Sequence, residues 1–201
     1  MTRKYQLKRR AERQEETRQR IVEATVALHE SVGGAGATIS AIAERAGVER
    51  LTVYRHFPDE RSLVTACTQH FWTQNPPPDP TAWQANVHPE TRLRTGLTAI
   101  YAYHRRTERM SLRTAHDVLD YPVLREALAP QLAYWSGVCE VLAAGWASGG
   151  AEHHMRAAVG HAIAFMTWHS LVREQGLDDT QAIELMVGML RCIECAAHDA
   201  T

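Results

Sequence analysis

Residues 49–57 place several hydrogen-bond donors at a spacing that would let them work together. The segment reads Glu-Arg-Leu-Thr-Val-Tyr-Arg-His-Phe. In a helix, its two large apolar residues, Val53 and Phe57, fall on one face and would be buried. The donors then point outward: Arg50, Thr52, Tyr54, Arg55 and His56. A short helix with this chemistry suits the major groove of DNA, whose base edges carry hydrogen-bond acceptors.

A second short helix must hold that segment in place. Ile39, Ile42 and Ala43 share one helical face just before it. Thr38 precedes this face and is a plausible N-cap. Gly47 can take the left-handed conformation that ends a helix, so the chain should turn at residues 46–48. Two short helices joined by such a turn predict a helix-turn-helix reader of DNA.

Residues 38–63 resemble the DNA-reading stretch of the TetR/AcrR family of one-component transcriptional regulators. The family stretch reads approximately Thr-x-x-x-Ile-Ala-x-x-Ala-Gly-Val-Ser-x-Gly-Thr-Leu-Tyr-x-His-Phe-x-x-Lys-x-x-Leu. The chain departs from it at Glu49, Leu51 and Glu60, where Ser, Gly and a phosphate-contacting Lys are usual. The matching residues are Thr38, Ile42, Ala43, Ala46, Gly47, Val48, Thr52, Tyr54, His56, Phe57 and Leu63.

The resemblance implies an all-α, nine-helix fold with an N-terminal three-helix DNA-binding bundle and a larger C-terminal domain for ligand binding and dimerisation. We therefore expect a homodimeric transcriptional regulator, acting as a repressor, that binds a palindromic operator in double-stranded DNA. A small apolar or aromatic effector would release it. No cofactor is expected. The alternative is a ligand-independent DNA-binding dimer, architectural or co-regulatory, whose C-terminal core is packed.

Each expected DNA contact follows from side-chain chemistry. Arg50 and Arg55 are candidates for guanine or phosphate contacts, and Thr52 for a base or a phosphate. Leu51 would touch a thymine methyl group. The remaining candidates contact phosphates: Thr38, Tyr54, His56 and Arg61.

The distribution of charge agrees with a DNA-reading N-terminal part. The net charge is -1, but residues 1–62 hold 12 Lys and Arg against 9 Asp and Glu, and residues 63–201 hold 10 against 14. We expect a DNA-binding domain over 1–62 and a ligand-binding and dimerisation domain over 63–201. Residues 1–13 would form a basic arm along phosphates or a minor groove, or else a solvated tail. Its cations are Arg3, Lys4, Lys8, Arg9, Arg10 and Arg13.

Apolar spacing predicts helices along the whole chain and hardly any strand. Four prolines within residues 76–80 predict a stiff connector between the two functional parts. The expected helices are 12–32, 38–46, 49–57, 59–74, 89–106, 110–119, 122–147, 152–175 and 179–197.

Polar and aromatic residues interrupt the otherwise apolar helices after the connector. Such residues could line a cavity with a few polar contacts, which is how small-ligand sites are built. For any one of them, ordinary core packing is the competing interpretation. The candidate ligand-binding residues are Tyr101, His104, His116, Tyr134, Trp135, Cys139, Phe165, Trp168 and His169.

The two C-terminal helices carry long apolar faces. In the family that the chain resembles, the last two helices of each subunit form a four-helix dimer interface. Burial within one chain is the alternative. The candidate interface residues are Val159, Ile163, Met166, Ser170, Ile183, Met186, Val187 and Leu190.

Other classes of function find little support in the sequence. Cys192 and Cys195 form a C-x-x-C pair, which we interpret as buried apolar cysteines in preference to a metal or redox site. His161 and His169 lie too far apart for a compact metal-ligand pair. We expect no metal and no enzymatic activity. No segment resembles a signal peptide or a membrane span, so the expected location is the cytoplasm, with no membrane partner.

Overall fold

The computed structural model describes residues 3–146 and 152–199. Within these ranges all regular elements are helices, which confirms the all-α prediction. The chain forms two compact units, Met1–Pro76 with Leu112–Ala129, and Pro77–Ser111 with Pro130–Thr201. The functional division between residues 62 and 63 remains a prediction.

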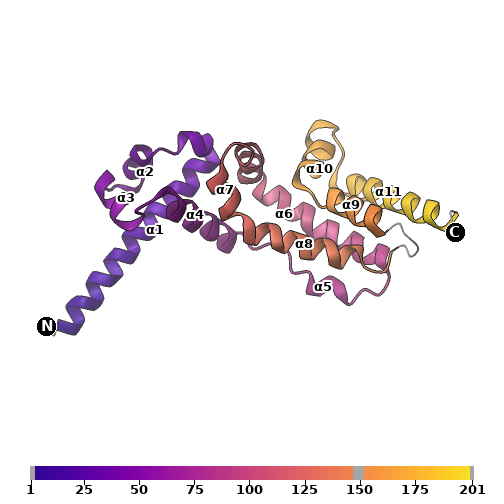
Figure 1. Cartoon of the computed structure of the whole chain (residues 1–201), viewed down its shortest axis with the longest axis horizontal. Coiled ribbons are helices and arrows are strands. Elements are labelled where there is room, and N and C mark those ends of the chain that lie inside the picture. The colour runs from indigo at the N-terminus through magenta and orange to yellow at the C-terminus, as the bar shows by residue number, and fades with distance from the viewer. Residues whose placement is uncertain (1–2, 147–151, 200–201) are drawn as a thin grey trace. The chain divides into compact units, whose positions relative to one another are not determined.

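The first unit is built around the N-terminal helix (Figure 1). Its core joins side chains from four helices, among them Ile21, Ile42, Val53, Phe57 and Leu63, none more than 4% exposed. These helices are α1 (Arg3–Gly36), α2 (Ile39–Ala46), α3 (Arg50–His56) and α4 (Glu60–Gln74); α7 (Pro122–Ala127) and the last residues of α6 (Pro89–Asp117) complete the unit.

Local hydrogen bonds explain why the short helices of this unit begin and end where they do. The Ala41 N–H donates to the Thr38 hydroxyl (3.2 Å) at the start of α2, and the Ser62 N–H donates to Asp59 (2.7 Å) at the start of α4. Gly47 has φ 65° and ψ 41°, and the Val48 N–H reaches back to the Ala43 carbonyl (3.0 Å). This left-handed turn is the one that the sequence predicts between the two motif helices.

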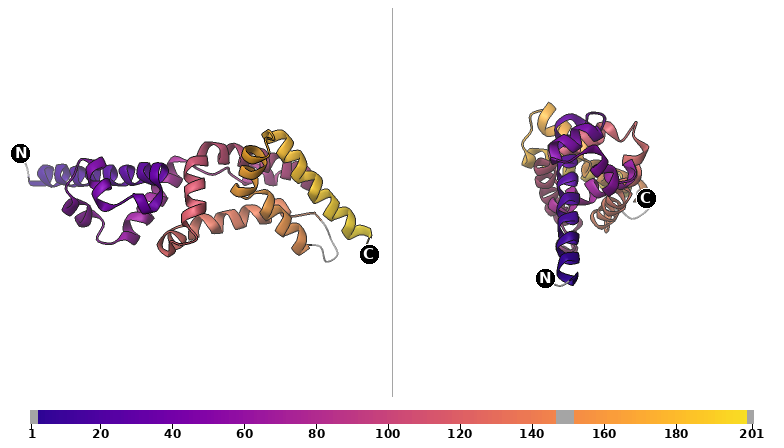
Figure 2. Two further views of the ribbon diagram at one scale, coloured as in Figure 1. Left: turned by 90° about the horizontal axis from the view of Figure 1, so that it is seen from above. Right: turned by 90° about the vertical axis from the view of Figure 1, so that its left-hand side faces the viewer.

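The N-terminal helix is longer than the sequence predicts. It begins at Arg3, where the prediction began at residue 12, and its first turns project beyond the other helices of the unit (Figure 2). The predicted end near residue 32 corresponds to Gly33, whose φ of 76° interrupts the helical conformation. Only a glycine adopts this conformation without strain.

The second unit packs its helices around a separate apolar core. Leu93, Leu97, Ile100, Val159 and Val187 are all fully buried there. Its elements are α5 (Thr81–Gln84), residues 89–111 of α6, α8 (Ala129–Ala143), α9 (Glu152–Ala162), α10 (Phe165–His169), the π-helix η1 (Ser170–Glu174) and α11 (Asp179–Asp199). The short α5 was not predicted; it buries Trp83 directly after the proline-rich connector.

Three predicted helix boundaries after the connector are wrong. The predicted helices 89–106 and 110–119 form one continuous helix, α6. The predicted helix 122–147 is broken between α7 and α8, next to Pro130, whose ring nitrogen cannot donate to a helix carbonyl. The predicted helix 152–175 is broken at Ala164, which is extended (φ -68°, ψ 137°).

The cysteine pair near the C-terminus lies on the surface of α11. Cys192 and Cys195 are exposed, so their interpretation as buried cysteines is wrong; both face outward on α11 beyond the buried Leu190.

None of the helices described combines the length and the apolar character that crossing a bilayer requires.

Candidate nucleic-acid interface

Helix α3 divides its side chains between the core and the solvent as its sequence predicts. Val53 is fully buried and Phe57, the C-cap, is 3% exposed. On the other side, Leu51 is 76% exposed and Tyr54 46% exposed. Arg50 and Arg55 are exposed, and Thr52 and His56 are half-buried. The helix therefore presents a protruding surface of two guanidinium groups, a phenol and one apolar side chain.

Two of the expected phosphate contacts already have partners. The Thr38 hydroxyl accepts the Ala41 N–H, which leaves its own hydrogen free to donate. Arg61 forms an ion pair with Glu126 of α7, although both side chains are more than half exposed. An exposed pair of this kind is weak, so the Arg61 guanidinium can exchange partners at small cost.

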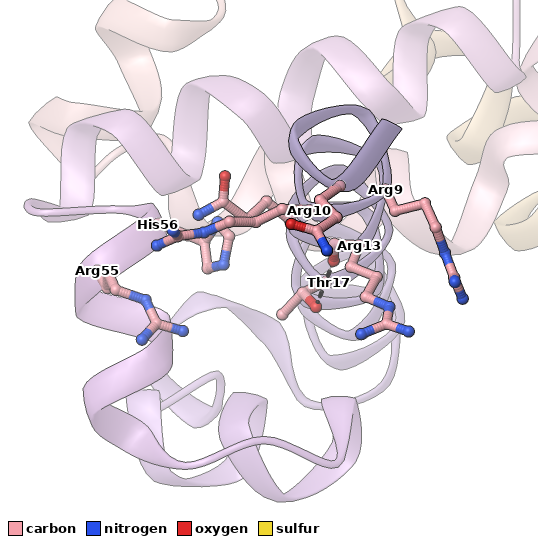
Figure 3. Close-up of a pocket in the computed structure, with 8 residues that line it drawn as sticks. Arg9, Arg10, Arg13, Thr17, Arg55 and His56 are labelled. Carbon is pink, nitrogen blue, oxygen red and sulfur yellow. Dashed lines mark hydrogen bonds between the residues drawn. The ribbon is translucent and has the colours of Figure 1, made fainter. Parts of the chain in front are cut away.

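The projecting part of α1 adds arginines to the same surface. A pocket of about 630 Å³ lies between α1 and α3, lined by Arg9, Arg10 and Arg13 on one side and by Arg55 and His56 on the other (Figure 3). The lining contains four arginines and no carboxylate. The lining residues that α1 contributes, which also include Gln6, Gln14 and Thr17, are spaced three or four positions apart and so share one helical face.

From the sequence, these arginines were predicted only as an arm along DNA or a solvated tail. Their helical spacing was the signal that places them on the side of α1 that faces α3. Sequence reasoning also missed Arg18, whose guanidinium lies 4.9 Å from the centre of the Phe57 ring. Together these side chains make a concave cationic surface that continues the exposed face of α3, and such a surface attracts a phosphate backbone.

This cationic environment acts on His56. Partial burial is the largest cause that lowers the pKa of His56 below 6.5, and the neighbouring Arg55 and Arg18 lower it further. A nearby phosphate would have the opposite effect, because an opposite charge favours the imidazolium. The free protein therefore holds His56 mostly neutral at pH 7, and binding to DNA should raise its pKa.

We predict that DNA affinity rises as the pH falls from 7.5 to 5.5, by roughly threefold to tenfold more in the natural chain than in His56→Gln. The sign follows from linkage, because a group whose pKa is raised by binding takes up protons on binding. Fluorescence anisotropy with a labelled duplex measures both affinities at constant salt. A gain of the same size in His56→Gln would remove this residue from the interface.

The candidate ligand-binding residues do not all come together. His104 lies within a ring cluster of the second unit, with centroids 5.6 Å from Phe165, 5.9 Å from Trp135 and 6.0 Å from Trp168. His116 instead belongs to the first unit. The remaining members also lie in the second unit and have neighbours there: Tyr101 contacts His104 (6.3 Å), Tyr134 contacts Trp135 (5.1 Å), Cys139 donates to the Arg156 carbonyl (3.4 Å), and His169 contacts Phe165 (5.8 Å).

Two of these residues donate hydrogen bonds to backbone carbonyls at the break between α9 and α10. The Tyr101 hydroxyl donates to the Ala162 carbonyl (3.0 Å), and Nε2 of His104 donates to the Ile163 carbonyl (2.9 Å). The extended backbone at Ala164 frees carbonyls that a continuous helix would have used, and these two buried donors satisfy them. Burial lowers the pKa of His104 to about 4, and its Nδ1 atom is buried without a partner.

We expect the free energy of unfolding to fall by about 3 kcal/mol as the pH drops from 6.5 to 4, through His104 alone. The folded protein resists protonation of this side chain, whereas the unfolded chain binds a proton near pH 6.5. The stabilisation is thus present above pH 6.5 and is lost progressively as the pH falls from 6.5 to about 4. Urea unfolding at both pH values, compared with His104→Gln, isolates this contribution. An unchanged pH dependence in the variant would contradict it.

Most of the candidate dimer residues are buried inside the single chain. One candidate, Met166, is 47% exposed, and Leu185 (44%) and Met189 (51%), which were not candidates, add exposed apolar surface on α11. Ser170 is half-buried at the start of η1. The buried ones, none more than 7% exposed, are Val159, Ile163, Ile183, Met186, Val187 and Leu190.

Residues 21–67 match the family described as bacterial regulatory proteins, tetR family. No curated protein matches the chain. Among solved structures, a transcriptional regulator from Rhodococcus sp. Rha1 is similar over 86% of this chain and 95% of its own, with 15% identity and a TM-score of 0.58. The multidrug binding protein EbrR, solved with imidazole, is similar over 86% and 93%, with 21% identity and a TM-score of 0.59. At these identities the structures support the fold.

Proposed function

Since the chain belongs, through residues 21–67, to the tetR family of bacterial regulatory proteins, we propose that it is a homodimeric repressor that binds a palindromic operator and is released by a small apolar or aromatic effector. Members of this family are DNA-binding transcriptional regulators, which also confirms the prediction that the chain is not an enzyme. The repressor role, the dimer and the effector are our proposal.

The observation that carries the DNA-binding part is the exposed face of α3 beside the cationic pocket. Arg50 and Leu51 protrude at the start of the helix, where a recognition helix meets base edges. Arg10 and Arg13 line the pocket from the neighbouring helix α1. The first group is suited to base contacts and the second to phosphate contacts, so the surface can both select and anchor a sequence.

Salt dependence tests the anchoring. Replacing Arg10 or Arg13 with alanine should weaken binding to all duplexes alike and reduce the slope of log K against log salt by about 1 for each phosphate that the variant no longer neutralises. Arg156→Ala, which removes an exposed arginine of the second unit, is the matched control and should leave the slope unchanged. Equal slopes for all of these proteins would exclude phosphate contacts by α1.

The proposed dimer is supported by apolar surface on α9 and α11. A groove of about 450 Å³ is lined by apolar side chains that include Met186, Met189 and Ile193, with His161 and Cys192 beside them. A two-fold operator requires two reading heads, and an isologous contact through this surface would supply them. Sedimentation velocity at micromolar concentration should show a dimer that Met189→Glu dissociates. A natural chain that sediments as a monomer would exclude it.

The proposed effector site is the ring cluster around His104. One structural neighbour is, by its name, a multidrug binding protein, which supports a ligand for this fold. The competing function, a ligand-independent DNA-binding dimer, is favoured by the hydrogen bonds that already occupy Tyr101 and His104. Tryptophan fluorescence and melting temperature across a library of apolar compounds separate the two. A response to no compound in the library would favour the second.

A further inference from the structure

The first unit contains a second cavity, which shares Thr38 and Tyr54 with the candidate DNA-binding surface. Its volume is about 690 Å³, within the range of pockets that hold small molecules. Residues of α1, α2, α3 and α4 line it together with the last residues of α6 and the segment that follows. All of its lining residues belong to this one unit.

The floor of the cavity is apolar and rigidly held. Ile42, Phe57, Leu63 and Val64 line it, and none is more than 4% exposed. Each of these side chains also packs in the core of the unit or lies buried beside it. Such a floor accepts an apolar body of matching shape, and burying that body is favourable in proportion to the area removed from water.

The rim of the cavity carries only one sign of charge. Asp59, Glu60, Asp117 and Asp120 line it, and no lysine or arginine does. Hydrogen bonds from Ser62 lower the pKa of Asp59, which keeps that carboxylate ionised. Of the two histidines in the lining, burial lowers the pKa of His29, and the largely exposed His116 places its Nδ1 atom 3.4 Å from Oδ1 of Asp117.

Asp117 is fixed against the backbone. Its Oδ2 atom accepts the Gly34 N–H at 2.7 Å, and a Cβ atom added at Gly34 would lie 3.3 Å from the same oxygen. Two cations lie near the cavity but outside its lining: Arg61, which pairs with Glu126 and also lowers the pKa of Asp59, and Arg113, which donates to the Ser31 carbonyl (3.3 Å). A positioned carboxylate beside an apolar cavity attracts a positive group attached to an apolar body.

We propose that this cavity binds a small organic monocation, such as an aryl-alkyl amine, with its apolar part on the floor and its ammonium group at the carboxylates. A consequence for DNA binding rests on the proposed function. The lining includes Ile42 of α2 and Tyr54 and Phe57 at the end of α3. An amine bound in the cavity would therefore contact the two helices that would read DNA. Any change in DNA affinity must equal the change in amine affinity caused by DNA.

The test compares 4-phenylbutylamine with 4-phenylbutan-1-ol, two probes of similar size that differ in charge. Methyl NMR spectra of the full chain should show saturable shifts of Ile42, Leu63 and Val64, with the amine binding at least tenfold more tightly than the alcohol. Equal affinities would overturn the role of the carboxylates. Absence of saturable shifts with the amine would overturn the site.

Charge-removing variants locate the ammonium group. Asp120→Asn and Asp117→Asn should each weaken amine binding at least fivefold and leave alcohol binding unchanged. Asp120 is exposed, so its variant keeps the fold even where Asp117→Asn, which alters the hydrogen bond to Gly34, does not. Glu16→Gln, an exposed carboxylate of the same unit outside the cavity, is the control. Unchanged amine binding in Asp120→Asn and in a folded Asp117→Asn would refute the proposal.

The outcomes separate this inference from the proposed function. Amine binding is measured without DNA, so it can succeed even if the chain binds no operator. DNA binding with no amine site would overturn the inference and leave the regulator intact. Where both hold, adding the amine to the protein–DNA complex should change the DNA dissociation constant in the natural chain and not in Asp120→Asn.

Discussion

Arg50→Ala should lower affinity for the preferred DNA sequence by roughly tenfold to a hundredfold and leave affinity for scrambled DNA nearly unchanged. The range follows from the 1–3 kcal/mol of discrimination that a good bidentate contact to a base typically supplies, or about 5- to 150-fold. Arg50 is the first residue of α3 and is exposed, next to the protruding Leu51. Its side chain is therefore free to reach a base edge.

The matched comparison is Tyr54→Phe, which removes one hydroxyl from the same helix. Tyr54 is 46% exposed, and its expected partner is a phosphate. This change should weaken binding to both sequences by a similar small factor. Competition titrations with the two duplexes at one salt concentration measure both effects. Equal losses on preferred and scrambled DNA for Arg50→Ala would show that Arg50 contacts only the backbone.

Trp168→Ala should lower the free energy of unfolding by about 3–5 kcal/mol, the usual cost of removing a fully buried large aromatic side chain. Trp168 has no exposed surface, and its indole N–H donates to Asp179 (2.9 Å) at the start of α11. The guanidinium groups of Arg105 and Arg173 lie 5.7 and 5.3 Å from its ring centre. The ring thus ties α10 to α11 and to two cations.

Two controls define this effect in urea unfolding. Trp168→Phe keeps much of the ring volume and loses the hydrogen bond, so it should cost about half as much. Leu132→Ala removes a side chain that is 59% exposed on α8 and should change stability by less than about 0.5 kcal/mol. A cost below about 1 kcal/mol for Trp168→Ala would mean that the ring is not part of the core, and its expected role in ligand binding would gain support.

The first unit could be predicted well because its signals are local. Thr38, Gly47 and Asp59 each act on backbone groups within five residues, so their types alone indicate where α2 and α4 begin and where α2 ends. The long start of α1 was missed because its exposed basic residues carry no apolar stripe. Their spacing indicates one face of a helix, but only the position of α3 shows that this face lines a pocket.

The second unit was harder to predict because its interruptions depend on distant residues. At the break at Ala164, the Ile163 carbonyl accepts a hydrogen bond from His104, which lies 59 residues away in the sequence. A regular apolar pattern through residues 152–175 gives no sign of such a bond. His104 and Tyr101 were predicted as ligand contacts because the sequence does not show their hydrogen-bond acceptors. These acceptors are backbone carbonyls at the end of α9, about sixty residues further along the chain.

Selection of bound sequences from a random pool of double-stranded DNA, at near-physiological salt, tests the central claim most directly. Low salt would let phosphate attraction hide any preference, so the salt concentration decides what the experiment reports. A homodimer that reads DNA through α3 predicts enrichment of a two-fold symmetric motif, which Arg50→Ala should blur in both halves. A pool that remains random after selection would contradict the account.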